Sequence, residues 1–77
     1  MIKWNQHIES NPNILFGKPI IKNTRIPVDL ILEKLGEGES IEELLLAYPR
    51  ITEEDIKACL FYAADSIKNI VTYSIAS

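Results

Sequence analysis

Residues 17–28 read GKPIIKNTRIPV and combine turn chemistry, a basic cluster and a helix start. Gly17 suits the first position of a two-residue hairpin turn, and Pro19 can open a strand only where no ladder donor is needed. Asn23 tolerates the left-handed conformation and turns the chain out of that strand. Together with the apolar run at residues 14–16, the stretch predicts an edge-exposed β-hairpin over residues 14–22.

The end of the same stretch predicts a helix that begins at Pro27. A proline at the first helical position loses no hydrogen bond, and Asp29 two residues later lies at the positive end of the helix dipole. Apolar residues then repeat at helical spacing until Gly36 ends the helix. These residues are Val28, Ile31, Leu32 and Leu35.

Two further helices follow. Ser40 and Glu43 form a capping box for a two-turn second helix. Thr52 caps the third helix, and Ile51 before it is placed to pack on Ile56 as a hydrophobic staple. The apolar stripe of the third helix runs for about five turns, longer than the first two helices can cover. Its members are Ile56, Cys59, Leu60, Ala63, Ile67, Ile70, Val71 and Ser74.

These elements predict one mainly α domain over residues 1–77, with the hairpin at 14–22 followed by a three-helix bundle over 27–75. The second and third helices have helix-turn-helix spacing, which predicts a homeodomain-like or winged-helix-like domain with a long C-terminal helix. A chain of 77 residues has a small core, burying only about 60% of its unfolded surface. Because the third helix also overhangs its neighbours, we expect a homodimer.

Composition restricts the function classes. The formal charge of -3 divides into four Lys/Arg against one acid in residues 1–28, and four against ten acids in residues 29–77. Any phosphate contact must therefore come mainly from the first third. One cysteine and one histidine exclude a disulfide framework and a multi-histidine metal site within one chain. Without an apolar leader or a run of about 20 apolar residues, we expect a cytoplasmic protein that binds no membrane.

The basic stretch is followed by the joint GEGES and by IEELLLAYPRITEEDIKACLFYAA. Together these motifs resemble a family of short prokaryotic proteins, domain-of-unknown-function family 433, from about residue 8 to residue 64. The resemblance implies a homeodomain-like helix-turn-helix fold and an antitoxin-like protein, often paired with a small PIN-like nuclease toxin. It brings no established catalytic or base-contacting residues. Family members usually have glycine where this chain has Phe16 and Asn23.

The basic residues of the opening stretch are the first candidate site. Lys18, Lys22 and Arg25 suit phosphate oxygens, and Thr24 adds a hydroxyl donor. Arg25 also suits the acidic metal-binding site of a PIN-like partner. An equal alternative is a solvated hairpin rim that discourages edge-to-edge strand pairing.

The third helix occupies the position of a recognition helix, but it opens with Glu53, Glu54 and Asp55. Three carboxylates repel phosphates, so we interpret them as capping residues. Arg50 and Lys57 flank this turn and offset the acids only in part. They are included as candidate DNA- or partner-binding residues.

Aromatic and apolar residues later in the third helix predict a dimer or partner interface. The expected interface residues are Phe61, Tyr62, Ile67, Ile70, Val71 and Tyr73. The alternative for Phe61 and Tyr62 is packing on the hairpin or on Trp4. Cys59, on the apolar face, is expected to behave as a small hydrophobe, and His7 is expected at the surface or in N-terminal packing.

The sequence therefore predicts a non-enzymatic, antitoxin-like protein that neutralises a PIN-like nuclease, with operator DNA as a further ligand. The alternatives are a DNA-binding transcriptional regulator without a toxin partner and a structural dimerisation module. No catalytic residue, cofactor, metal or small-molecule substrate is expected.

Overall fold

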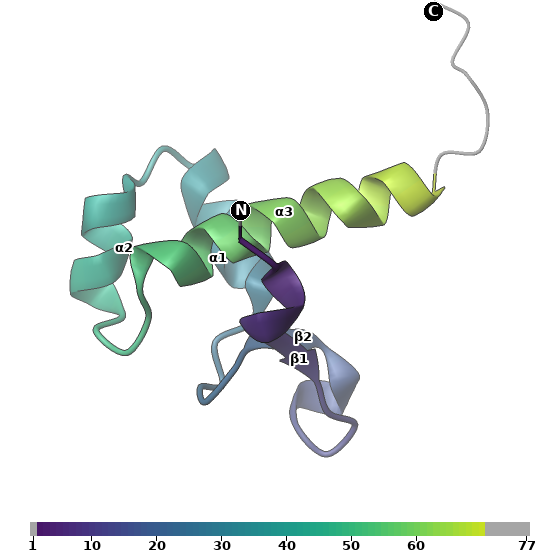
Figure 1. Cartoon of the computed structure of the whole chain (residues 1–77). Helices are drawn as coiled ribbons and strands as arrows, with labels where there is room; N and C mark the ends of the chain where they lie inside the picture. Colours follow the sequence, from purple (N-terminus) through teal and green to yellow (C-terminus); the bar gives the residue numbers. More distant parts are fainter. Residues whose placement is uncertain (1, 71–77) are drawn as a thin grey trace, which may run out of the picture.

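A computed structural model describes residues 2–70, with side chains described up to residue 68 (Figure 1). The hairpin consists of strands β1 (Ile8–Ser10) and β2 (Pro19–Ile21), with short 3-10 helices η1 (Trp4–Gln6) before it and η2 (Leu15–Gly17) within it. Helices α1 (Val28–Gly36), α2 (Ile41–Ala47) and α3 (Glu53–Ile70) follow. The predicted fold class, a hairpin before three helices, is confirmed. Among the described helices, none is long and apolar enough to cross a membrane.

The position predicted for the first hairpin strand was wrong. The antiparallel pairing joins Ile8 to Ile21 and Ser10 to Pro19, so the hairpin starts before the expected range of 14–22. Ile8 and Ile21 both enter the core, where they are 5% and 1% exposed. This pairing therefore buries two large aliphatic side chains, which a strand at residues 14–16 does not, since Phe16 is fully exposed.

Residues 15–17 instead form a left-handed turn. Leu15, Phe16 and Gly17 have φ values of 50°, 57° and 84°. The N–H of Gly17 donates to the Ile14 carbonyl at 3.0 Å, and the N–H of Lys18 donates to the Leu15 carbonyl at 3.1 Å. A left-handed non-glycine residue costs about 1–2 kcal/mol, so Leu15 and Phe16 place strain in this turn.

The predicted helix caps are largely confirmed. Ser40 and Glu43 form the reciprocal capping box of α2, with backbone-to-side-chain hydrogen bonds of 2.8 and 3.1 Å. The α1 helix ends at Gly36 as expected, but Pro27 precedes it instead of being its first residue, with extended φ and ψ of -70° and 147°. That conformation lets Pro27 bridge back to Ile20 and close the loop after β2.

The core lies where the three helices meet β1 and β2, and α3 contacts both the hairpin and the other two helices. Its fully buried large side chains are Ile20, Ile21, Ile31, Leu44, Ile56 and Cys59. Ile51 and Ile56 belong to the same core, as the staple requires. The second half of α3 projects beyond the other elements (Figure 1).

The N-terminal segment η1 packs on the middle of α3 (Figure 1). The rings of Trp4 and Tyr62 meet edge to face, with centroids 4.9 Å apart and planes at 82°. The indole N–H of Trp4 donates to Asp65 Oδ2 at 2.7 Å. These contacts combine the favoured aromatic geometry with a hydrogen-bond partner for the indole, which fixes η1 against the helix.

Candidate functional site

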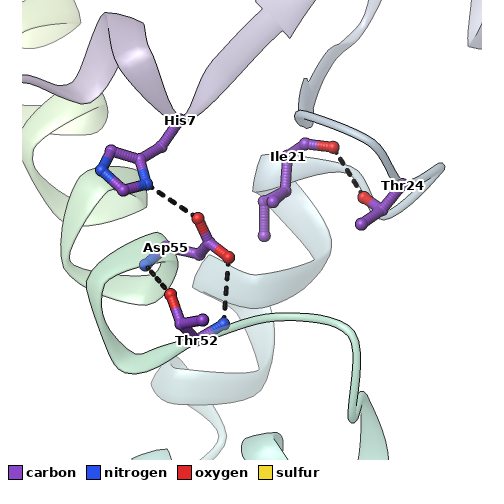
Figure 2. Close-up of polar contacts among 5 residues, drawn as sticks. All are labelled: His7, Ile21, Thr24, Thr52 and Asp55. Carbon is purple, nitrogen blue, oxygen red and sulfur yellow. Dashed lines mark hydrogen bonds and ion pairs between the residues drawn. The ribbon is translucent and has the colours of Figure 1, made fainter.

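The loop after β2 presents the basic residues, and its own hydrogen bonds hold it in shape. The backbone N–H of Thr24 donates to the Ile21 carbonyl at 3.1 Å, and Asn23 takes the expected left-handed φ of 65°. The Thr24 hydroxyl donates to the same carbonyl at 2.7 Å (Figure 2). It also accepts the N–H of Ile26 at 3.0 Å. The single hydroxyl proton of Thr24 is therefore used within the loop.

Two arginines from segments distant in the sequence line one hollow beside this loop. Arg25 and Arg50 line one hollow of about 460 Å³, together with Asn23 and Thr24. Arg50 belongs to the turn before α3, and both arginines are exposed. Neither guanidinium forms an ion pair with any other residue that the structure describes. Both retain the five N–H donors that make arginine suited to carboxylate and phosphate groups.

The floor of this hollow is not purely basic. Glu9 of β1 and Ile14 also line it. With Arg25 and Arg50, the carboxylate leaves a formal charge of +1 at the hollow. Such a site suits a small, directional contact with a few anionic oxygens more than a long polyanion track.

The structure separates the remaining basic candidates from this hollow. Lys18 Nζ pairs with Asp29 Oδ2 at 3.0 Å, with both side chains more than half exposed. Lys57 Nζ pairs with Glu53 Oε2 at 3.6 Å, one turn away on α3. Lys22 is exposed and has no ion pair within residues 2–68. Exposed pairs of this kind contribute little to stability, so these lysines remain available to solvent.

The acidic first turn of α3 is organised inward at Asp55. The carboxylate of Asp55 accepts the Thr52 N–H at 2.9 Å, while the Asp55 N–H donates to the Thr52 hydroxyl at 3.1 Å (Figure 2). The capping interpretation is thus confirmed for Asp55. The same carboxylate accepts a hydrogen bond from His7 Nδ1 at 2.8 Å (Figure 2). Because a carboxylate only accepts, Nδ1 of His7 carries the proton.

The expected interface residues of α3 divide into packed and exposed ones. Tyr62 packs on Trp4, which was the alternative for this residue. Phe61 and Ile67 remain 44% and 60% exposed. Ile70 ends α3, whereas Val71 and Tyr73 lie outside the described residues. The exposed part of the expected surface is therefore narrow within residues 2–68.

Cys59 lies fully buried in the core, as expected for a small hydrophobe. Burial, assisted by the nearby Asp55 charge, raises the pKa of its thiol from 9.0 to about 12. A thiol protonated at neutral pH is neither a good nucleophile nor a metal ligand. Among the described residues, no group of three His, Cys, Asp or Glu side chains is arranged to hold a metal ion.

The comparisons with known proteins agree with this architecture. A family model described as "Protein of unknown function (DUF433)" matches residues 8–63. The chain belongs to the DUF433 family. The matched region includes the hairpin, both arginines of the hollow and the first part of α3.

One curated relative is the "Uncharacterized protein y4eO" of Sinorhizobium fredii (strain NBRC 101917 / NGR234). It is 36% identical over 56 residues, which are 73% of this chain and 25% of the relative. The chain thus spans about a quarter of that protein's length.

A solved relative is the crystal structure, at 2.00 Å resolution, of a DUF433 member protein from Anabaena variabilis ATCC 29413. It is 34% identical, with a TM-score of 0.76, and the alignment covers 83% of this chain and 63% of that chain. The two proteins therefore share their fold over most of this chain, and not only over the hairpin and the start of α1.

Proposed function

We propose that this DUF433 protein is a non-enzymatic, antitoxin-like binding protein that neutralises a PIN-like nuclease in the cytoplasm. Arg25 and Arg50 would contact the acidic metal-binding site of the nuclease. The observation that carries this proposal is that the two arginines line one hollow although 25 residues separate them, with no ion pair to another described residue.

The chemistry of the hollow fits carboxylates. A guanidinium binds a carboxylate through two parallel N–H donors, and two guanidinium groups in one hollow can hold two carboxylates of a metal site. With Glu9 also at the hollow, its net formal charge of +1 would replace part of the charge of the catalytic cation. Since neither arginine gives up an ion pair with a described residue, the contact costs little reorganisation within this chain.

Operator DNA is the second candidate ligand, favoured by the exposed positions of Lys22 and Arg25 on one loop. The first turn of α3 argues against a conventional major-groove contact. Glu54 is exposed there, and Asp55 is committed to the cap and to His7. If the protein binds DNA, these charges favour contact with phosphates through the loop and Arg50 over contact of α3 with the bases.

The test is co-expression with the PIN-like nuclease encoded nearest to this protein, followed by co-purification and an RNA-cleavage assay. We expect a complex in which cleavage is inhibited, and loss of inhibition in the R25A/R50A variant. The K3A/K68A variant is the matched control because it also removes two exposed cations, both of which lie outside the hollow. Absence of a complex, or full inhibition by the double variant, would refute the proposal.

DNA binding is tested separately from nuclease binding by measuring the fluorescence anisotropy of labelled DNA from upstream of the gene over a range of salt concentrations. A steep salt dependence that disappears in the R25A/R50A variant supports the second candidate. If that variant loses DNA binding but still inhibits the nuclease, the hollow serves DNA and the nuclease contact lies elsewhere.

A further inference from the structure

Phe16 is an aromatic side chain that packs on none of the residues that the structure describes. It is 101% exposed, and its φ and ψ of 57° and 32° place it in the left-handed region between Leu15 and Gly17. A bulky residue in this region is an outlier, and such outliers concentrate at contact and binding sites. The chain thus holds a large apolar group outward, in a conformation that glycine would adopt at no cost.

An apolar hollow of about 180 Å³ lies on the same chain, close in sequence to this residue. Its walls are mainly carbon, from Pro19, Val28, Leu32 and Tyr62. A cavity of about 150 Å³ is sufficient for a benzene ring, so this hollow has room for one phenyl group. Full exposure of Phe16 shows that the ring does not enter the hollow of its own chain.

The rim of this hollow carries one cation and one anion, so it has no net formal charge. Lys18 and Asp29 line the hollow and form an exposed ion pair with each other at 3.0 Å. Lys18 follows Phe16 by only two residues. A ring from a second copy would bring the partner's own Lys18 and Asp29 to this rim, and because each pair is neutral the two rims meet without net charge repulsion.

We propose that two copies of this chain associate about a two-fold axis, with Phe16 of each inserted into the apolar hollow of the other. In a two-fold interface each contact occurs twice, so a protruding group and its receptor on one surface suffice. The interface uses β2, η2 and α1 in place of the overhang of α3. The apolar hollow shares no lining residue with the Arg25 and Arg50 hollow, and the proposal does not depend on the proposed nuclease or DNA binding.

The proposal is tested by light scattering and sedimentation of the full chain from 1 µM to 1 mM. We expect a concentration-dependent dimer, and in Phe16→Ala and Phe16→Gly a dissociation constant at least about thirtyfold higher, since each removes an anchor residue. Both variants should fold because the side chain is fully exposed. Leu46→Ala is the matched control, since it truncates an apolar side chain that is 84% exposed on α2.

The two variants also distinguish the loss of the Phe16 ring from the relief of backbone strain at residue 16. Phe16→Gly should melt at a higher temperature than Phe16→Ala, because only glycine relieves the left-handed φ. Both should lose the dimer equally. A monomer at every concentration, or a dimer that either Phe16 variant leaves unchanged, would overturn the proposal.

The location of the ring is read from NMR spectra recorded over the same concentrations. Ring-current shifts of the Val28 and Leu32 methyl groups should grow with the dimer fraction and vanish in Phe16→Ala. Shifts confined to the exposed side chains of α3, with none at the hollow, would also overturn it.

Discussion

Asp55 joins two parts of the fold through one carboxylate. It caps α3 in a reciprocal pair with Thr52, and it accepts a hydrogen bond from His7, 48 residues earlier. The side chains of His7 and Asp55 are only 23% and 15% exposed, so solvent screens their contact less than a surface pair. Replacing Asp55 by alanine removes the hydrogen bond from the Thr52 N–H, the contact with His7 and a favourable charge at the helix N-terminus, whereas the bond from the residue 55 N–H to the Thr52 hydroxyl remains.

The magnitude follows from these losses. The lost hydrogen bond from the Thr52 N–H to the carboxylate costs about 1 kcal/mol. The hydrogen bond with His7 adds about 1 kcal/mol, and the charge at the helix N-terminus adds about 0.5 kcal/mol. We expect the free energy of unfolding to fall by about 2–3 kcal/mol in Asp55→Ala. For a domain of this size the melting temperature should fall by about 10–20 °C.

Urea unfolding followed by circular dichroism measures this difference. Glu54→Ala is the matched control, because Glu54 lies in the same turn but is exposed and should cost about 0.5 kcal/mol or less. A double-mutant cycle with His7→Ala isolates the long-range contact and should give a coupling near 1 kcal/mol. Surface substitutions usually change the free energy of unfolding by about 0.5 kcal/mol or less. If the free energies of unfolding of Asp55→Ala and Glu54→Ala differ by less than about 0.5 kcal/mol, the reasoning fails.

Three further predictions use other parts of the fold. The pKa of Cys59 is raised from 9.0 to about 12 in the folded protein. The contribution of the protonated thiol to the free energy of unfolding is therefore fully present below pH 9. It should then fall by up to about 1.4 kcal/mol per pH unit as the pH rises toward 12, a slope that Cys59→Ala should lack in pH-dependent urea unfolding. Thr24→Val should cost about 1–2 kcal/mol in thermal unfolding by leaving loop hydrogen bonds unmade, whereas Thr24→Ser should stay close to the parent. Trp4→Phe should cost about 1 kcal/mol in urea unfolding, because it keeps an aromatic ring near Tyr62 but loses the hydrogen bond to Asp65.

Local chemistry explains which parts of the fold the sequence predicts. The capping box of Ser40 and the cap at Thr52 each involve residues three positions apart, so a short stretch of sequence is enough to predict them. The left-handed Asn23 is predicted for the same reason. The prediction of the first strand was wrong because two segments, the apolar run at 14–16 and Ile8–Ser10, are both able to pair with β2. Only the burial of Ile8 in the core decides between them.

The site was less predictable because it is assembled by tertiary contacts. Nothing in the spacing of Arg25 and Arg50 indicates that they share a hollow. The contact of His7 with Asp55 was missed as well, although a lone histidine and a capping aspartate were both noticed in the sequence. Thr24 was expected to face a ligand, but its hydroxyl serves the loop, since a loop so short must satisfy its own backbone groups.

The hydrogen bond from Trp4 to Asp65 joins two residues that both lie outside the region shared with the family. The shared region is residues 8–63, so one partner comes just before it and the other just after it. This hydrogen bond forms only when both residues are present, although Trp4 also packs on Tyr62, which lies inside the shared region. Among relatives we therefore expect an aromatic donor upstream to accompany the carboxylate downstream, whereas a chain without the carboxylate can keep an aromatic ring upstream for its packing alone.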